Sequence, residues 1–178
     1  MRTALVLGGA RTIWADVEAA LELGEFDGVV GCNDVGIVWP GVMDAWVSLH
    51  GNNLKAWAHQ RQTKGHPPHA ALYGHTEAAA VTHVTPYKFP GQDHSGSSGL
   101  FALKVALIDL GFDRAVLCGV PMIAEHNHFF DPRAWDGARH HQIAWRECLA
   151  QIKDRARSMS GWTADLLGRP DAAWLSST

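Results

Sequence analysis

The sequence predicts an α/β protein in three layers, with a mostly parallel sheet between two layers of helices. Apolar runs at 3–7, 28–34 and 114–119 have the β-rich composition of strands buried on both faces. Segments with helical spacing or an apolar surface all round lie between them, at 13–23 and 100–110. Glycine-rich turns separate the two kinds of segment, and this alternation is typical of parallel sheets.

The size and composition favour one domain spanning 1–178. The chain has 178 residues, 47% of them hydrophobic and 19% charged, which suffices for a real core. The net charge of −3 gives no basic surface for nucleic acid, and no segment is apolar enough to span a membrane. The apolar run at 3–8 is too short for a signal peptide core, so we expect a cytoplasmic protein. The cysteines, Cys32, Cys118 and Cys148, lack metal-like spacing and are expected to be buried thiols in a reducing compartment.

The first unit is a strand at 3–7, a turn and a helix at 13–23 that ends at Gly24. The turn contains Gly8, Gly9, Ala10 and Arg11. Such a unit begins a nucleotide-binding half-fold. The complete G-x-G-x-x-G pattern is absent, which argues against a classical NAD site. A tight turn without a ligand is the alternative.

Polar side chains end the next two strands. Asn33 and Asp34 close the run at 28–34, and His50 closes a strand at 45–50 after an irregular connection at 35–43. Parallel strands present these ends at the edge where ligands bind. Asp34 also suits a turn or cap for the next segment.

The middle of the chain contains a helix at 51–62, a loop at 63–69 and short strands at 70–73 and 79–84. Its histidines, His69, His75 and His83, lack the spacing of a metal motif, so a surface or interface role is favoured.

A serine- and glycine-rich loop precedes the apolar helix at 100–110. Ser98 is the expected N-cap, and Gly111 ends the helix before the strand at 114–119. Glycine lets the backbone approach a ligand, and the helix start offers N–H groups. The candidate ligand-binding residues of this loop are Ser95, Gly96, Ser97, Ser98 and Gly99.

A long loop at 121–132 leaves the strand at 114–119 and contains His126 and His128. One of these histidines is expected to act as a general base or to contact phosphate. A metal site is an alternative, with Glu125, Asp131, His140 and His141 as further ligands. A hydrogen-bonded structural loop is the third possibility. A helix at 138–157 follows, and the tail at 160–178 is expected to pack on the domain or on a partner subunit.

Four short motifs resemble a known group of proteins. They are Leu5-Val-Leu-Gly-Gly-Ala-Arg-Thr-Ile-Trp, Val30-Gly-Cys-Asn33-Asp34, Ser98-Gly99 with its helix ending in Leu110-Gly-Phe112, and Cys118-Gly119-Val-Pro-Met. The group is the Rossmann-like proteins related to bacterial family-42 sialyltransferases, motility-associated glycosyltransferase-like proteins and 6-hydroxymethylpterin diphosphokinase-like proteins. The resemblance covers roughly residues 3–35 and 95–128.

The resemblance implies a Rossmann-like fold and a nucleotide site. In those sialyltransferases the matching positions embrace a nucleotide, a histidine is the general base and no metal is essential. Carried over by position, the nucleotide would contact Gly8, Gly9, Ala10, Asn33, Ser98 and Gly99, with His126 or His128 as the base.

Three functions follow as hypotheses. The first is a transferase acting on a nucleotide-linked sugar, in which Arg11 neutralises the leaving phosphate; no cofactor beyond that donor is implied, and a role for Mg²⁺ is left open. The second is a non-catalytic binding module, because the first turn reads Gly-Gly-Ala-Arg-Thr where the family has Gly-x-Gly-x-Ser. The third is a metal-dependent phosphotransferase or hydrolase. The substrate is expected to be a small molecule, and a homo-oligomer is compatible with each function.

Overall fold

One sheet of seven parallel strands forms the centre of the molecule. The computed structural model describes residues 1–69, 71–124, 128–131 and 133–177. The strands are β1 (Thr3–Leu7), β2 (Gly28–Cys32), β3 (Ala45–Val47), β4 (Leu72–Gly74), β5 (His83–Val84), β6 (Arg114–Cys118) and β7 (Ala156–Ser158). Their order across the sheet is β5-β4-β3-β2-β1-β6-β7. The predicted α/β class with a parallel sheet is confirmed.

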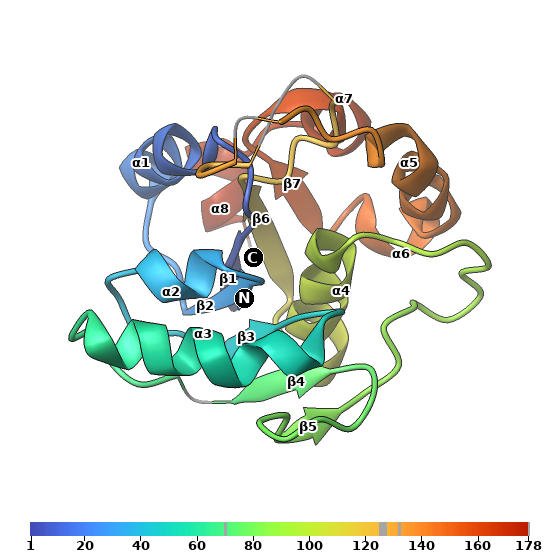
Figure 1. The fold of residues 1–178 in the computed structure, drawn as a ribbon. Coiled ribbons are helices and arrows are strands. Elements are labelled where there is room, and N and C mark those ends of the chain that lie inside the picture. Colours follow the sequence, from blue (N-terminus) through green and yellow to red (C-terminus); the bar gives the residue numbers. More distant parts are fainter. Residues whose placement is uncertain (70, 125–127, 132, 178) are drawn as a thin grey trace.

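Helices cover both faces of the sheet (Figure 1). One face is covered by α1 (Ile13–Leu23), α2 (Val35–Val38), α3 (Gly51–Thr63) and α8 (Ala172–Ser176). The other face is covered by α4 (Ser98–Lys104), its continuation η1 (Val105–Asp109), α5 (Ala138–Glu147), α6 (Leu149–Ile152) and α7 (Gly161–Leu167). These are the three layers that the sequence predicts. No helix in the described ranges is long and apolar enough to cross a membrane.

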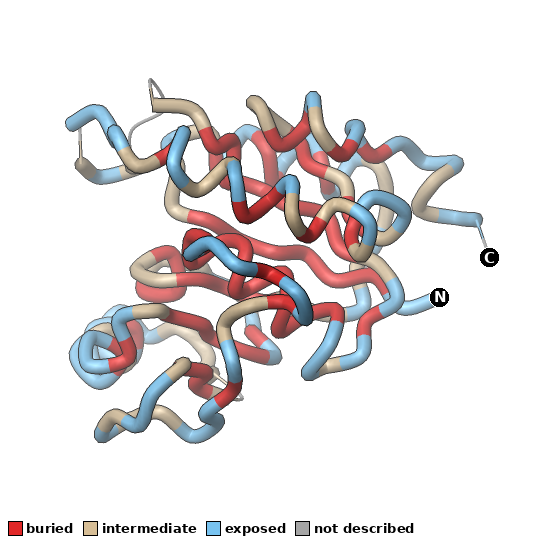
Figure 2. The backbone as a smooth tube through the Cα atoms, turned by 90° about the vertical axis from the view of Figure 1, so that its right-hand side faces the viewer, coloured by how far each residue is buried: buried red, intermediate tan, exposed pale blue. Residues whose placement is uncertain are grey.

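The central strand β1 shows why the sheet needs both layers. All of its residues are buried. Ala4 and Val6 belong to the core that contains α4, whereas Leu5 and Leu7 belong to the core that contains α1. Successive side chains of a strand point to opposite faces, so a strand that is buried throughout must be covered on both faces. Figure 2 shows the buried strands in the middle of the molecule and exposed backbone on the outside.

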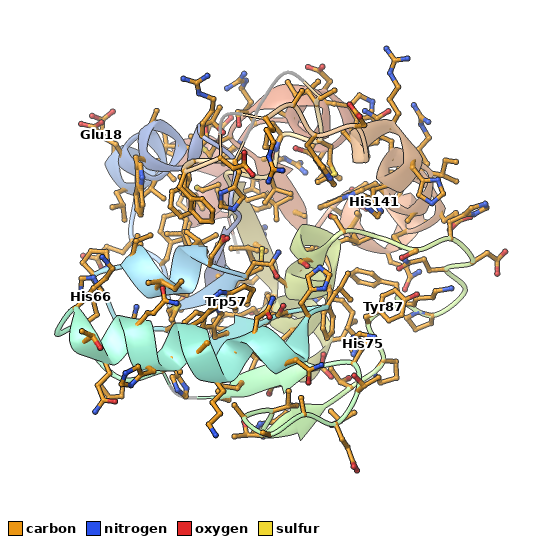
Figure 3. All side chains as sticks on the ribbon, in the orientation of Figure 1. Glu18, Trp57, His66, His75, Tyr87 and His141 are labelled. Carbon is orange, nitrogen blue, oxygen red and sulfur yellow. The ribbon has the colours of Figure 1, made fainter. Side chains whose placement is uncertain are left out.

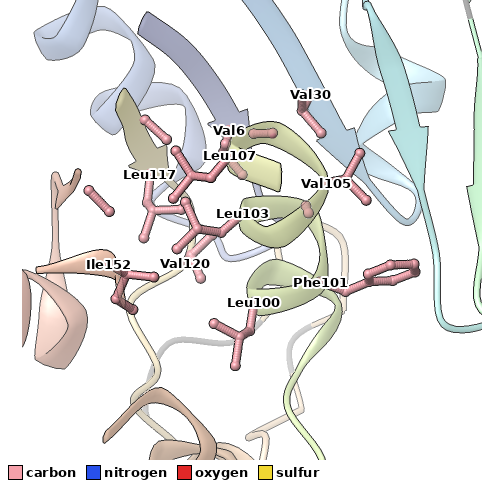
Figure 4. Close-up of a cluster of buried hydrophobic side chains, with 14 of the residues drawn as sticks. Val6, Val30, Leu100, Phe101, Leu103, Val105, Leu107, Leu117, Val120 and Ile152 are labelled. Atoms are coloured by element: carbon pink, nitrogen blue, oxygen red, sulfur yellow. The ribbon is translucent and has the colours of Figure 1, made fainter. Parts of the chain in front are cut away.

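The α4–η1 segment fills the core between the sheet and α6 (Figure 4). Every residue of α4 is buried. The N-cap is Ser97 and not Ser98, because the Ser97 hydroxyl accepts the Leu100 N–H at 3.3 Å. The predicted helix changes to a π-helix after Lys104, whose ammonium pairs with Asp109 at 2.8 Å and also bonds Thr85. The wider turn of a π-helix lets Lys104 and Asp109 meet.

Several predicted boundaries were wrong. The third strand ends at Val47 rather than His50, and only two residues of the expected strand at 79–84 form β5. The expected irregular connection at 35–43 begins with one helical turn, α2. The predicted helix at 138–157 is divided into α5 and α6 and ends before β7, which pairs with β6. The tail forms α7 and α8, and Trp174 of α8 packs on the α1 side of the sheet.

Candidate functional site

A cavity of about 610 Å³ opens at the carboxyl edge of the sheet. The ends of β1, β2, β3 and β6 meet there with the start of α4 and the segment that follows β6. This is the edge where parallel α/β folds place ligands. The lining residues are Gly8, Gly9, Ala10, Cys32, Asn33, Asp34, Leu49, His50, Ser97, Ser98, Gly99, Gly119, Val120, Pro121, Met122, Ile123, His128, Phe130, Asp131, Arg133, Ala134, Trp135 and His141.

The turn after β1 depends on two glycines. A Cβ on Gly8 would lie 2.3 Å from the carbonyl oxygen of Gly119, and one on Gly9 would lie 2.4 Å from Nε2 of His128. The Ala10 N–H also donates to the Gly119 carbonyl at 3.1 Å. The glycines therefore allow two segments from elsewhere in the chain to close against the turn.

The end of β2 presents an oriented amide. Asn33 has a positive φ of 53°, which asparagine tolerates better than most residues. Its Oδ1 accepts the Ser48 hydroxyl at 2.9 Å. Because that bond occupies the carbonyl end, the NH₂ group of Asn33 remains as a donor for the cavity.

Asp34 and His128 form a close pair in the cavity wall. Asp34 Oδ1 lies 2.8 Å from Nε2 of His128, and both side chains are largely covered. The oxygen accepts no well-directed hydrogen bond among the described residues, so the contact is mainly electrostatic. The rings of Phe129 and Phe130 pack on the imidazole at centroid distances of 4.6 and 4.2 Å. The phenyl rings and the carboxylate together fix the position of His128.

The start of α4 contributes Ser97, Ser98 and Gly99 to the lining. The first N–H groups of a helix have no acceptor within it. Ser97 accepts that of Leu100, and those of Ser98 and Gly99 are the ones that can meet a ligand. Ser95 and Gly96, also predicted as binding residues, lie outside the lining. The Ser95 carbonyl instead accepts from Nδ1 of His141 at 3.0 Å.

The loop before α4 is tied to α5 by a carboxylate. Glu147 accepts the backbone N–H groups of Asp93 and His94 at 3.1 and 3.0 Å, and its Oε1 lies 2.5 Å from Nδ1 of His94. These bonds, first those from the His94 backbone and ring, lower the pKa of Glu147. The polar loop is therefore fixed from the same helix that carries His141.

A buried carboxylate positions the segment that leaves β6. Asp16 Oδ2 accepts the Gly119 N–H at 2.8 Å and the Ser160 hydroxyl at 2.6 Å. The Thr163 hydroxyl donates to the Val120 carbonyl. Three elements, α1, β6 and α7, are thereby joined behind the cavity.

The outer wall carries a salt bridge on the segment after β6. Arg133 pairs with Asp131 at 2.6 Å, and the guanidinium hydrogen bonds lower the pKa of Asp131 to about 2. Asp131 is therefore ionised at neutral pH and neutralises Arg133.

The remaining predicted residues are placed as follows. His50 lines the cavity, and Arg11 is exposed and lies outside the lining. His126 and Glu125 lie outside the described residues. No group of three or more metal-ligating side chains occurs in the described ranges.

Several lining residues are not among the binding candidates that the sequence predicts. They come from the segment after β6 and from α5, and they are Gly119, Val120, Pro121, Met122, Ile123, Phe130, Arg133, Ala134, Trp135 and His141. Leu49 and Cys32 were missed as well. The adjacent histidines His140 and His141 could have marked this part of the site, but the sequence suggested them only as metal ligands. No local pattern marks the others, because the path of a long loop decides their position.

Cys32 lines the cavity but remains a protonated thiol. Burial, followed by the charge of Asp34, raises its pKa to about 12. A thiol with this pKa is a poor nucleophile at neutral pH.

Solved sialyltransferase structures share the fold. The crystal structure of sialyltransferase CST-II in complex with a trisaccharide acceptor and CMP has a TM-score of 0.64 and 14% identity, over 96% of this chain and 87% of that chain. CstII from Campylobacter jejuni in complex with CMP-3FNeuAc has a TM-score of 0.65 and 13% identity, over 100% and 89%. No protein-family model and no curated protein matches the chain. At these identities the likeness establishes the fold alone. Of the three groups that the sequence resembles, only the sialyltransferases gain support.

Proposed function

We propose that this protein is a transferase that acts on a nucleotide-activated sugar, with the nucleotide bound in the cavity at the carboxyl edge of the sheet. The observation that carries the proposal is the convergence there of the Gly8-Gly9 turn, Asn33 and the start of α4. The neighbouring structures contain CMP, a CMP-sugar analogue or a trisaccharide acceptor, which supports the same class of ligand.

The phosphate would lie between the glycine turn and the start of α4. Backbone N–H groups there and the hydroxyls of Ser97 and Ser98 are suitable donors for phosphate oxygens. The NH₂ group of Asn33 would donate to the nucleoside or to the phosphate. Arg11 is not placed to neutralise the leaving group, since it lies outside the lining.

His141 is the stronger candidate for the general base. Its Nδ1 lies 3.0 Å from the Ser95 carbonyl, which accepts only, so Nδ1 carries the proton and Nε2 has the free lone pair. The predicted base, His128, instead directs Nε2 toward Asp34, and its Nδ1 accepts the Phe130 N–H at 3.5 Å, so both ring nitrogens already have partners. We therefore assign proton transfer to His141 and ligand positioning to His128.

The reaction then balances without another reactant. Nε2 of the histidine takes the proton of the acceptor hydroxyl. The hydroxyl oxygen forms a bond to the anomeric carbon of the donor as the bond from that carbon to the phosphate oxygen breaks. The nucleotide leaves with the electron pair. The backbone N–H groups at the glycine turn donate to its phosphate oxygens and stabilise their negative charge.

Nucleotide binding is the direct test. Thermal unfolding and calorimetry with CMP, CDP, UMP, UDP and GDP, each with and without Mg²⁺, should reveal at least one nucleotide that stabilises the protein at millimolar concentration. The variant Asn33→Asp should bind that nucleotide at least tenfold more weakly, because a carboxylate replaces the amide donor. The absence of stabilisation by all five nucleotides would contradict the proposal.

Two histidine variants separate the assigned roles. With the nucleotide sugar that binds, His141→Asn should lower kcat by about 10²- to 10⁴-fold with little change in KM. His128→Asn should mainly raise KM. His59→Asn, on the exposed face of α3, is the control. A loss of kcat confined to His128→Asn would assign the base to His128 instead.

The binding-module hypothesis expected a blocked pocket at this edge. The described residues leave an open cavity there instead, so the geometry favours the transferase.

A further inference from the structure

The cavity lining has little positive charge to bind an anionic group on the ligand other than its phosphate. Arg133 is the one Lys or Arg among the described lining residues, and Asp131 already neutralises it at 2.6 Å. The sequence of the neighbouring positions outside the described ranges, Glu125, His126, Asn127 and Pro132, contains no Lys or Arg either.

Asp34 adds a negative charge deeper in the wall. Its side chain is 15% exposed, and its Oδ1 is buried without a hydrogen bond from the described residues. His128 lies 2.8 Å away, so even a protonated imidazole would leave the pair neutral rather than positive. Because Oδ1 is covered and faces His128, Oδ2 is the oxygen that can meet a ligand in the cavity that Asp34 lines.

Hydroxyl groups are the ligand donors that suit this oxygen. They donate to a carboxylate oxygen without adding charge, and one such oxygen can accept from two adjacent hydroxyls of a sugar. A ligand carboxylate in the same part of the cavity would find no unpaired Lys or Arg among the described lining residues, and beside a neutral His128 the charge of Asp34 would repel it.

We propose that Asp34 makes the site selective for a donor whose transferred sugar is uncharged and rich in hydroxyls, and that it rejects sugar acids. This inference rests on the proposed function and names its donor class. It separates this protein from its structural neighbour that holds CMP-3FNeuAc, an analogue of a donor whose sugar is an acid.

The test compares sugars that differ in one carboxylate. Calorimetry at pH 7.5 would measure UDP-glucose against UDP-glucuronate, and CMP against CMP-3FNeuAc, with the native protein and with Asp34→Asn. We expect the native protein to bind each acidic sugar nucleotide at least tenfold more weakly than its neutral or sugar-free comparator. In Asp34→Asn the two dissociation constants should differ by about threefold or less, because the carboxylate that repels the acidic sugar is removed.

Two further variants keep the test decisive. Asp34→Ser removes the same charge with a smaller side chain and is measured if Asp34→Asn does not fold. Asp154→Asn makes the same change of charge at an exposed site before β7, at the opposite edge of the sheet, and should retain the native ratio.

The outcomes distinguish the two proposals. Equal binding of neutral and acidic sugars by the native protein, or an unchanged ratio in the Asp34 variants while nucleotides still bind, would overturn the selectivity alone. Failure of every free nucleotide and sugar nucleotide to bind would overturn the proposed function together with the inference that rests on it.

Discussion

Individual residues in the cavity wall are fixed by contacts from distant parts of the chain. The imidazole of His128 lies over Gly9, faces Asp34 and is covered by phenyl rings. Side chains that are positioned in advance lose less freedom when a ligand binds. His128 can therefore contribute to binding even though it is not the assigned base.

The variant Gly9→Ala tests this arrangement. The added methyl group would lie 2.4 Å from Nε2 of His128, so the ring must shift from its present position beside Asp34. We expect nucleotide affinity to fall at least tenfold and the free energy of unfolding to drop by about 1–3 kcal/mol, as for overpacked sites. Calorimetry and urea unfolding would measure the two effects.

Gly24→Ala is the matched control for that variant. Its added methyl group would have Leu175 as its nearest neighbour, at an ordinary distance of 3.5 Å. Nucleotide affinity should therefore stay unchanged. If Gly9→Ala behaves in the same way as this control, the close packing against His128 has no role in binding.

At the scale of elements, the loop before α4 and the helix α5 act as one support for the site. Glu147 holds the loop by its backbone, and His141 of α5 donates to the Ser95 carbonyl. Figure 3 shows where His141 and Glu18 lie on the ribbon. Because α5 carries both Glu147 and His141, losing the contacts of Glu147 with the loop should also disturb the contact of His141 with Ser95.

The variant Glu147→Gln tests that support. It removes the negative charge of the side chain that accepts the N–H groups of Asp93 and His94, so these hydrogen bonds should weaken. Amide hydrogen exchange should therefore become faster at residues 93–99 and stay unchanged in β1. Exchange followed by mass spectrometry would measure this. Glu18→Gln, an exposed change on α1, is the control. Unchanged exchange at 93–99 would show that the loop is held by other contacts.

The lowered pKa of Glu147 makes the attachment of the loop before α4 to α5 depend on pH. Its value is lowered in the folded protein, so its stabilising effect is present above the normal pKa of a glutamate and is lost as the pH falls through the lowered value. The protection factors at 93–99, which compare each exchange rate with the intrinsic rate at the same pH, should accordingly fall in acid, and this fall should be absent in Glu147→Gln.

At the scale of the whole molecule, the sheet buries thiols together with apolar side chains. Cys32, Cys118 and Cys148 are all free and buried. Burial is the main cause of the raised pKa of each, and for Cys32 and Cys148 the value reaches about 12. The folded protein therefore keeps them protonated at pH values where unfolded cysteine ionises.

This burial predicts a loss of stability in alkali. Below about pH 8 the thiols are protonated in both states and contribute no pH dependence. Above about pH 9 the unfolded thiols ionise first, so the free energy of unfolding should fall by up to ~1.4 kcal/mol per pH unit for each thiol until the pH approaches 12. Urea unfolding at pH 7.5, 9 and 10 would measure the slope, and Cys32→Ala should reduce it. Equal stability at pH 7.5 and 10 would contradict the prediction.

The sequence by itself determined the layered fold and the edge of the sheet that holds the cavity. Runs such as 4–7 and 115–118 are apolar at every position, and only a sheet covered on both faces buries them. Polar residues directly after such strands, such as Asn33, must then lie at its carboxyl edge. These conclusions need only local pattern and the geometry of parallel strands.

Only the tertiary structure decided the rest. The strand β7 has the sequence Ala-Arg-Ser, which carries no strand signal, and it forms because β6 offers a free edge beside it. His141 reaches the cavity, and Ser95 and Arg11 do not line it, because long-range contacts set the course of each loop. The pairing of Asp34 with His128 likewise joins residues far apart in the chain, and no local pattern encodes such a contact.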